Sequence, residues 1–230
     1  MSQFCRVAAR AHPARDLLLV PTLVLALVLA SAPARAFAPD LFGYRQAAQE
    51  GIDTFPQWVQ ALERQLRDNL RDGDCSERHI NRCHMTRWLA FLGGLRGRPA
   101  AEQLREVNRY ANELPYVLDI DNYGVEDYWA IPREFFNNGG DCEDYAITKY
   151  FSLRWLGYPD ADLRIVVVQD TNLRAPHAVL AVGRGEDILV LDNQVRGVLP
   201  HRQVVHYAPV YSINEHGWWI HTPAAAGPRS

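Results

Sequence analysis

The stretch Gly139-Gly140-Asp141-Cys142-Glu143-Asp144-Tyr145-Ala146 places a cysteine where a helix is expected to begin and surrounds it with carboxylates. The apolar residues that follow fit one helical stripe, and the pattern stops at Gly157 and Pro159, which predicts a helix over residues 141–156. Cys142 would then lie in the first turn, where free backbone N–H groups and the helix dipole favour thiolate over thiol. We therefore treat Cys142 as a candidate nucleophile.

The acidic neighbours of Cys142 can be interpreted in two ways. Asp141, Glu143 and Asp144 raise the pKa of the thiol through like charge, and a bound Ca²⁺ would offset this because it takes carboxylate oxygens as ligands. Alternatively, Asp141 is an N-cap with Asp144 as its capping-box partner, and no metal is present. The local sequence leaves both interpretations open.

A nucleophilic cysteine needs a base, and His177 stands at the head of an alternating, β-branched run that predicts a strand entered through Pro176. Asp192 ends the next strand-like run, after a turn over residues 183–187. If the two runs pair as a hairpin, both side chains could face Cys142. The order cysteine, histidine, aspartate on helix, strand and strand favours a catalytic triad.

Residues 127–134, 139–147, 177–180, 191–193 and 209–214 together resemble the bacterial transglutaminase-like cysteine proteinases, whose best-known members are periplasmic adhesin proteases of the LapG type. The resemblance spans roughly residues 57–220 and implies a papain-like fold. It also implies a triad of Cys142, His177 and Asp192. A calcium site beside the nucleophile would comprise Asp141, Glu143 and Asp144.

The resemblance further implies a function. The chain would be a periplasmic, calcium-dependent cysteine endopeptidase that cleaves the N-terminal region of a large surface adhesin at a small-residue site, releasing it and controlling biofilm attachment. An inner-membrane receptor for cyclic di-GMP would sequester the protease. Two alternatives remain: amide transfer or deamidation at glutamine side chains, which uses the same thioester, and a non-catalytic interaction module. Trp129 is a candidate oxyanion donor through its indole N–H, or a core aromatic at the cleft wall.

The N-terminus predicts a cleaved signal peptide over residues 1–36, followed by one proteinase domain over residues 37–230. Arg6, Arg10 and Arg15 precede an apolar stretch over residues 17–30, and Ala34-Arg35-Ala36 fits a signal peptidase site. A membrane anchor is the alternative, although the stretch is short for one. Removing residues 1–36 takes away four arginines and one aspartate, so the formal net charge changes from −3 to −6. This acidity argues against a nucleic-acid partner.

The cysteines fit an oxidising compartment. Cys5 leaves with the signal, and the eight-residue spacing of Cys75 and Cys83 predicts a disulfide that leaves Cys142 free. The alternative is a metal site, because His79 and His84 lie among these cysteines, although the spacing fits no common zinc pattern.

The remaining patterns predict an α+β fold, with a helical lobe that carries the nucleophile packed on an antiparallel sheet and the substrate cleft between them. Amphipathic stripes predict helices over residues 57–71 and 99–114, and β-branched runs from residue 163 onward predict strands. The glycines of residues 93–97 indicate a loop, since neither a preceding strand nor a Lys-Ser pair supports a phosphate-binding motif.

Overall fold

The computed structural model describes residues 37–72 and 83–224. The predicted signal peptide lies outside these residues, as do Cys75 and His79. The described chain confirms the predicted α+β fold, with most helices in its first half and most strands in its second.

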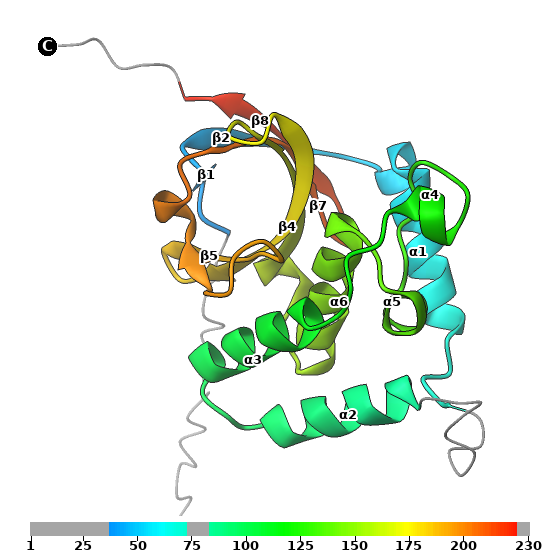
Figure 1. Cartoon of the computed structure of the whole chain (residues 1–230). Coiled ribbons are helices and arrows are strands. Elements are labelled where there is room, and N and C mark those ends of the chain that lie inside the picture. The colour runs from blue at the N-terminus through cyan, green and yellow to red at the C-terminus, as the bar shows by residue number, and fades with distance from the viewer. Residues whose placement is uncertain (1–36, 73–82, 225–230) are drawn as a thin grey trace, which may run out of the picture. The chain divides into compact units, whose positions relative to one another are not determined.

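The strands form one antiparallel sheet that curls round on itself (Figure 1) in the order β1-β2-β8-β7-β3-β4-β5-β6. The strands are β1 (Asp40–Leu41), β2 (Tyr44–Gln49), β3 (Leu163–Asp170), β4 (Ala175–Arg184), β5 (Asp187–Leu191), β6 (Leu199–Pro200), β7 (Tyr207–Ile213) and β8 (Trp218–Pro223). Because β2 pairs with β8, the two ends of the described chain meet in adjacent strands.

The helices gather on one side of this sheet (Figure 1). They are α1 (Pro56–Arg67), α2 (His84–Leu95), α3 (Ala100–Asn112), α4 (Asp119–Asn122), α5 (Pro132–Asn138) and α6 (Cys142–Trp155), with short 3-10 turns at Ile52–Thr54, Asp160–Asp162 and His201–Gln203. Helix α6 contacts β3 and β4 as well as α3 and α5, so it lies between the sheet and the other helices.

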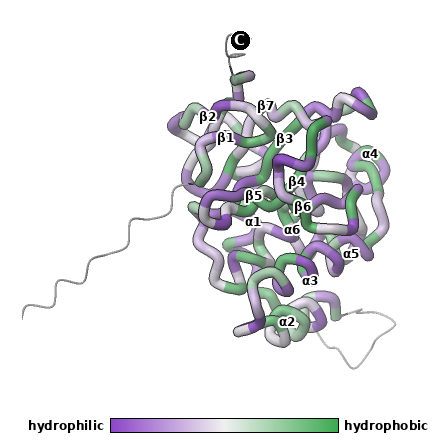
Figure 2. The backbone as a smooth tube through the Cα atoms, turned by 90° about the vertical axis from the view of Figure 1, so that its left-hand side faces the viewer, coloured by the Kyte–Doolittle hydropathy of each residue, from purple (hydrophilic) through white to green (hydrophobic). Residues whose placement is uncertain are grey.

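Two hydrophobic cores flank the sheet because successive strand side chains point to opposite faces. On β4, Leu180 and Val182 join the helices, whereas Val179 and Ala181 join a second core formed within the curl of the sheet, together with Tyr207. Figure 2 shows the central strands as predominantly hydrophobic. This burial on both faces explains the near-continuous apolar runs of β3 and β4.

Helix α6 is buried far more completely than one amphipathic stripe predicts. Residues 144–150 are all buried, among them the polar or charged Asp144, Thr148 and Lys149. Such groups are expensive to bury without partners. Their presence marks the start of α6 and its surroundings as a functional region.

Three sequence predictions need correction. The first helix ends at Arg67 rather than residue 71, because Asp68 is extended and its carboxylate binds Arg133 at 2.6 and 2.9 Å, while Leu70 has a positive φ of 54°. The helix predicted over 99–114 spans Ala100–Asn112. Gly93 and Gly94 belong to the last turn of α2, not to a loop.

Candidate active site

The Gly139-Gly140 pair lets the chain pass very close to its neighbours before α6 begins. Gly139 has a φ of +77°, and a Cβ there would stand 2.6 Å from the carbonyl oxygen of Pro115. At Gly140 a Cβ would overlap the carboxylate of Asp144. A side chain at either position would therefore displace the start of the helix that carries Cys142.

Asp141 is the N-cap of α6, and a capping box joins it to Asp144. The carboxylate of Asp144 accepts hydrogen bonds from the backbone N–H of Asp141 at 3.2 Å and of Ala130 at 2.6 Å. The capping interpretation of these two residues is thus correct. It does not exclude a metal site, since Asp141 Oδ1 is buried without a hydrogen-bond partner among the described residues.

The thiol of Cys142 is half-buried and donates a hydrogen bond to Glu143 Oε2 at 3.2 Å. Burial, followed by the negative charges of Glu143 and Asp141, raises the pKa of Cys142 well above its usual value. A hydrogen bond from the backbone N–H of Ala178 acts in the opposite direction. The surroundings of the thiol therefore oppose thiolate unless the carboxylates are neutralised.

His177 and Asp192 meet as the hairpin predicts. His177 lies near the start of β4, Asp192 follows β5 directly, and His177 Nε2 is 2.9 Å from Asp192 Oδ1. Both residues are buried, at 3% exposure each. Because Nε2 is engaged with Asp192, Nδ1 is the ring nitrogen left to exchange a proton with a thiol. The side-chain amide of Gln194 lies 3.4 Å from Nδ1.

Both carboxylate oxygens of Asp192 are bonded. Oδ1 also accepts from the backbone N–H of Gln194 at 2.9 Å, and Oδ2 accepts from the hydroxyl of Tyr207 at 2.6 Å. Burial alone would raise the pKa of Asp192, but these hydrogen bonds and His177 outweigh it, and the pKa is lowered. Asn112 fixes the backbone by donating to the Asp192 carbonyl at 2.8 Å. Tyr207 belongs to the second core, and its hydrogen bond holds the Asp192 carboxylate in place. No sequence pattern marked this residue.

Lys149, two turns after Cys142 on α6, is fully buried, and its Nζ has no hydrogen-bond partner among the described residues. It lies 5.8 Å from the ring centre of Tyr145. Burial lowers the pKa of Lys149 to about 7, with the charge of Asp192 acting in the opposite direction. No sequence motif marks this lysine.

Cys142 and His177 line one cavity of about 430 Å³. Its other lining residues come from the segment before α4, the loop before α5, the start of α6 and the sheet: Tyr116, Glu126, Asp127, Trp129, Asp141, Glu143, Val167, Pro176, Ala178 and Tyr211. Trp129 is 6% exposed and its indole N–H donates to Asp127 Oδ1 at 3.0 Å. In this arrangement Trp129 is part of the cavity wall, and its N–H is already engaged.

Carboxylates gather beside the nucleophile, and the structure adds Asp119 and Asp127 to the three predicted from the sequence. Asp119 lies within ligand-sharing distance of Asp141 and Asp144, and also of Asp127 and Glu143. Both added residues precede the nucleophile by 15 residues or more. Only the fold brings them together, so spacing along the chain gave no signal.

The electrostatics of this cluster fit a divalent cation. Burial raises the pKa of Asp119 to about 6, and burial together with Asp141 and Asp144 raises the pKa of Glu143 to about 10. Asp119 Oδ1, like Asp141 Oδ1, is buried without a partner among the described residues. Crowded carboxylates with orphaned oxygens are the hard ligands that Ca²⁺ takes.

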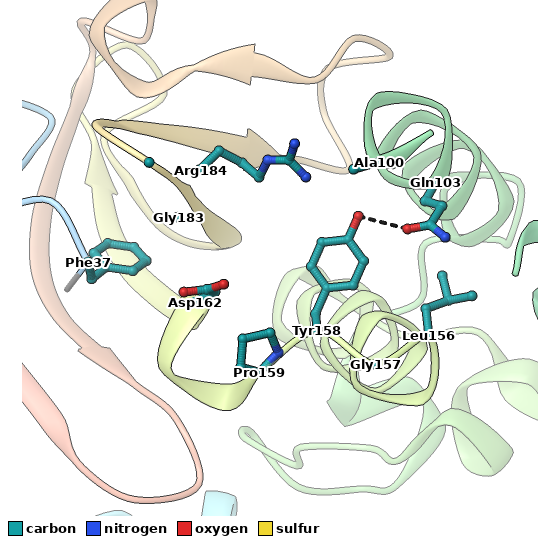
Figure 3. A pocket seen from close by; sticks show the side chains of 11 residues that line it. Phe37, Ala100, Gln103, Leu156, Gly157, Tyr158, Pro159, Asp162, Gly183 and Arg184 are labelled. Atoms are coloured by element: carbon teal, nitrogen blue, oxygen red, sulfur yellow. Dashed lines mark hydrogen bonds between the residues drawn. The ribbon is translucent and has the colours of Figure 1, made fainter. Parts of the chain in front are cut away.

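Other features lie away from this cavity. A second cavity of about 590 Å³ is lined by Phe37, Tyr158 and Arg184, and there Tyr158 donates to Gln103 at 2.9 Å (Figure 3). Asp160, Glu215 and His216 form another cluster, but Tyr150, Arg154 and each other's side chains already engage them. None of the candidate triad residues belongs to either group.

Two sequence predictions fall partly or wholly outside the described residues. The Cys75–Cys83 disulfide stays a prediction because Cys75 lies outside the described residues, while Cys142 is a free cysteine. The signal peptide is likewise untested. No helix in residues 37–72 and 83–224 is long and apolar enough to cross a membrane.

Comparison with known proteins supports one family. Residues 74–224 match the model of the bacterial transglutaminase-like cysteine proteinases. Among solved structures, LapG of Legionella pneumophila is 35% identical over 60% of this chain and 76% of that one, with a TM-score of 0.55. Its calcium-bound form is 32% identical over 72% and 86%, with a TM-score of 0.56. An EGTA-treated form is 30% identical over 76% and 87%, again with a TM-score of 0.56. The comparison with curated proteins found no match.

Proposed function

This chain belongs to the bacterial transglutaminase-like cysteine proteinases and is a cysteine peptidase, and we propose that it is a periplasmic, calcium-dependent endopeptidase whose triad is Cys142, His177 and Asp192. The observation that carries this proposal is that a free thiol at a helix start lines one cavity with His177, which is itself hydrogen-bonded to Asp192. The carboxylate cluster at the same cavity supports the calcium requirement.

The mechanism follows from the two ring nitrogens of His177. Nδ1 takes the proton of the Cys142 thiol as Sγ attacks the scissile carbonyl carbon. Asp192 holds the Nε2–H tautomer and stabilises the resulting imidazolium. His177 then returns the proton to the leaving amine, and the C–N bond breaks. Water, deprotonated by His177, hydrolyses the thioester and restores the thiol. The backbone N–H of Cys142 would donate to the oxyanion.

Asp141, Glu143, Asp144 and Asp119 would hold the calcium ion, with Asp127 within reach of the same cluster. When bound, the ion supplies positive charge that offsets the carboxylates raising the pKa of Cys142. Glu143 would exchange its hydrogen bond with the thiol for a metal contact, leaving the thiol to His177. The relatives solved with calcium and after EGTA treatment support the calcium requirement, and the residues that hold the ion are our assignment.

The substrate we propose is the N-terminal region of a large surface adhesin, cleaved to release the adhesin and so control biofilm attachment. An inner-membrane cyclic di-GMP receptor would sequester the protease. Family membership supports both partners, and the signal sequence predicted over residues 1–36 supports the periplasmic location. The predicted Cys75–Cys83 disulfide fits the same compartment.

The test uses purified mature protein mixed with N-terminal fragments of large adhesins from the same genome, with and without EGTA. We expect Cys142→Ala to abolish cleavage and leave the thermal unfolding temperature unchanged. Mass spectrometry separates the outcomes: two fragments support hydrolysis, whereas a one-dalton shift or an amine adduct indicates deamidation or amide transfer. A Cys142→Ala protein with full biological function would overturn the enzymatic proposal.

A further inference from the structure

Residues 115–117 pass alongside the nucleophile region and pair with it through an isolated β-bridge. The backbone N–H of Val117 donates to the Gly140 carbonyl at 2.9 Å, and the N–H of Gly140 donates to the Pro115 carbonyl at 3.4 Å. Together they form a parallel bridge between Tyr116 and Gly140, two residues before Cys142. Gly139 permits this close approach, because any side chain there would meet the Pro115 carbonyl.

This pairing leaves the other edge of the segment open. In a parallel bridge, the residues on either side of Tyr116 bond to Gly140, so the N–H and C=O of Tyr116 itself point the opposite way. Within the part of the chain that the structure describes, neither group has a hydrogen-bond partner. An unpaired strand edge is a template for pairing with another extended chain.

The open edge belongs to the catalytic cavity. The side chain of Tyr116 is 55% exposed, lines the cavity with Cys142 and His177, and packs on Tyr145 with ring centres 6.3 Å apart. Leu118 and Ile120 follow it on the surface at 49% and 53% exposure. The open backbone edge at Tyr116 is therefore followed by exposed apolar side chains at Leu118 and Ile120.

We propose that this edge, residues 115–117, binds the substrate as an added β-strand, with one substrate residue exchanging both backbone hydrogen bonds with Tyr116. The proposal rests on the proposed function and defines its substrate as an extended, unfolded segment. Main-chain pairing supplies affinity that is independent of side chains, and it aligns the scissile carbonyl with Cys142. Because Tyr116 pairs with Gly140, two residues before Cys142, we expect the paired substrate residue to lie close in sequence to the scissile bond.

The probe is a peptide aldehyde, acetyl-tetra-alanine with a C-terminal aldehyde. The Cys142 sulfur adds to the aldehyde carbon and the thiol proton passes to its oxygen, giving a hemithioacetal. Binding is measured as protection of Cys142 from iodoacetamide, so no natural substrate is needed. A set of aldehydes, each with a single N-methylated amide, removes one N–H donor at a time. We expect one N-methylated position to weaken protection by about tenfold, and its neighbours to have much smaller effects.

Tyr116→Pro and Tyr116→Ala form a matched pair, because both remove the side chain and only the first removes the backbone N–H. We expect Tyr116→Pro to weaken protection about tenfold relative to Tyr116→Ala, when the protection of each variant is expressed relative to its own labelling by iodoacetamide without aldehyde. Equal protection by all N-methylated aldehydes, or none by the parent aldehyde, would overturn the strand-addition proposal alone. Failure of iodoacetamide to label Cys142 would instead contradict the proposed function.

Discussion

The candidate active site has two halves, one around Asp192 and one around Cys142. They differ in how completely the protein's own groups supply hydrogen-bond partners and balancing charge. Around Asp192, three donors occupy both carboxylate oxygens and lower its pKa. Around Cys142, carboxylates crowd together, two of their oxygens are buried without partners among the described residues, and the pKa of the thiol is raised.

This difference in hydrogen bonding and charge indicates that the Cys142 half depends on a bound cation. The His177–Asp192 pair is held by the fold, through Tyr207 from the second core and Asn112 from α3. The nucleophile's half is complete only when positive charge balances its carboxylates. We therefore propose that calcium acts on the Cys142 half of the site, whereas the fold alone holds the His177–Asp192 pair.

Calcium removal should have the largest effect, and it should act on the Cys142 half of the site alone. We expect EGTA to reduce cleavage by roughly 1000-fold or more, because the thiol then faces uncompensated carboxylates. Mg²⁺ should not restore activity, since it demands tighter octahedral geometry. Cleavage assays and isothermal titration measure both effects. Asp119→Asn should weaken calcium binding, whereas Asp121→Asn, on the same helix α4 but exposed, should not. Full activity in metal-free protein would contradict the calcium requirement.

The substitution Asp192→Asn tests the His177–Asp192 half of the site, which the fold holds without a metal. The amide of an asparagine keeps one oxygen for His177 and Gln194, but it carries no negative charge to stabilise the imidazolium. We expect cleavage to fall about 100-fold while calcium affinity stays unchanged. Steady-state kinetics and calcium titration of the same sample measure the two quantities. A loss of calcium affinity equal to the loss of activity would show that the halves are not independent.

Tyr207→Phe removes one donor from Asp192 and should reduce kcat about tenfold. The lowered pKa of Asp192 contributes stability that is present above its unfolded value and lost as pH falls through the folded value. Without Tyr207 the folded pKa rises, so acid unfolding should begin at higher pH. Kinetics and circular dichroism across pH 2–6 test this. An unchanged acid transition would show that Tyr207 does not lower the pKa of Asp192.

Lys149→Met should have the smallest effect on catalysis and a visible one on stability. The lowered pKa means that the unfolded chain binds the lysine proton more tightly, so burial costs most below pH 7 and progressively less as pH rises from about 7 toward 10.5. We expect the variant to unfold a few degrees higher at pH 6, with the gain shrinking by pH 9. Calorimetry at both values tests this. An equal or lower unfolding temperature at pH 6 would show that the charge is stabilising.

The sequence predicted the parts of the site that local patterns encode. The start of α6, the β4–β5 hairpin and the meeting of His177 with Asp192 follow from capping, alternation and turn chemistry, all of which act over a few residues. The papain-like family assignment rested on the same motifs. The triad roles themselves stay predictions until the substitutions are made.

Long-range features were missed for physical reasons. Asp119 and Tyr207 reach the site only through tertiary packing, and neither lies in a periodic pattern that marks it. Strand β2 is largely polar and exposed, so it lacks the alternation that identifies a strand and is defined by pairing with β8. Helix α2 did carry a signal, with Met85, Trp88 and Leu92 buried at helical spacing, but its terminal glycines indicated a loop.

The pairing of β2 with β8 sets the order in which the molecule can be completed. Residues 44–49 have their strand partner at residues 218–223, so synthesis of nearly the whole chain separates the two. Contacts this distant in sequence are among the slowest to form during folding. Strand β2 must therefore wait for β8 before its pairing is complete. A chain released before residue 218 would expose both β2 and β7 as bare edges, making it a substrate for quality-control proteases and not an early form of the enzyme.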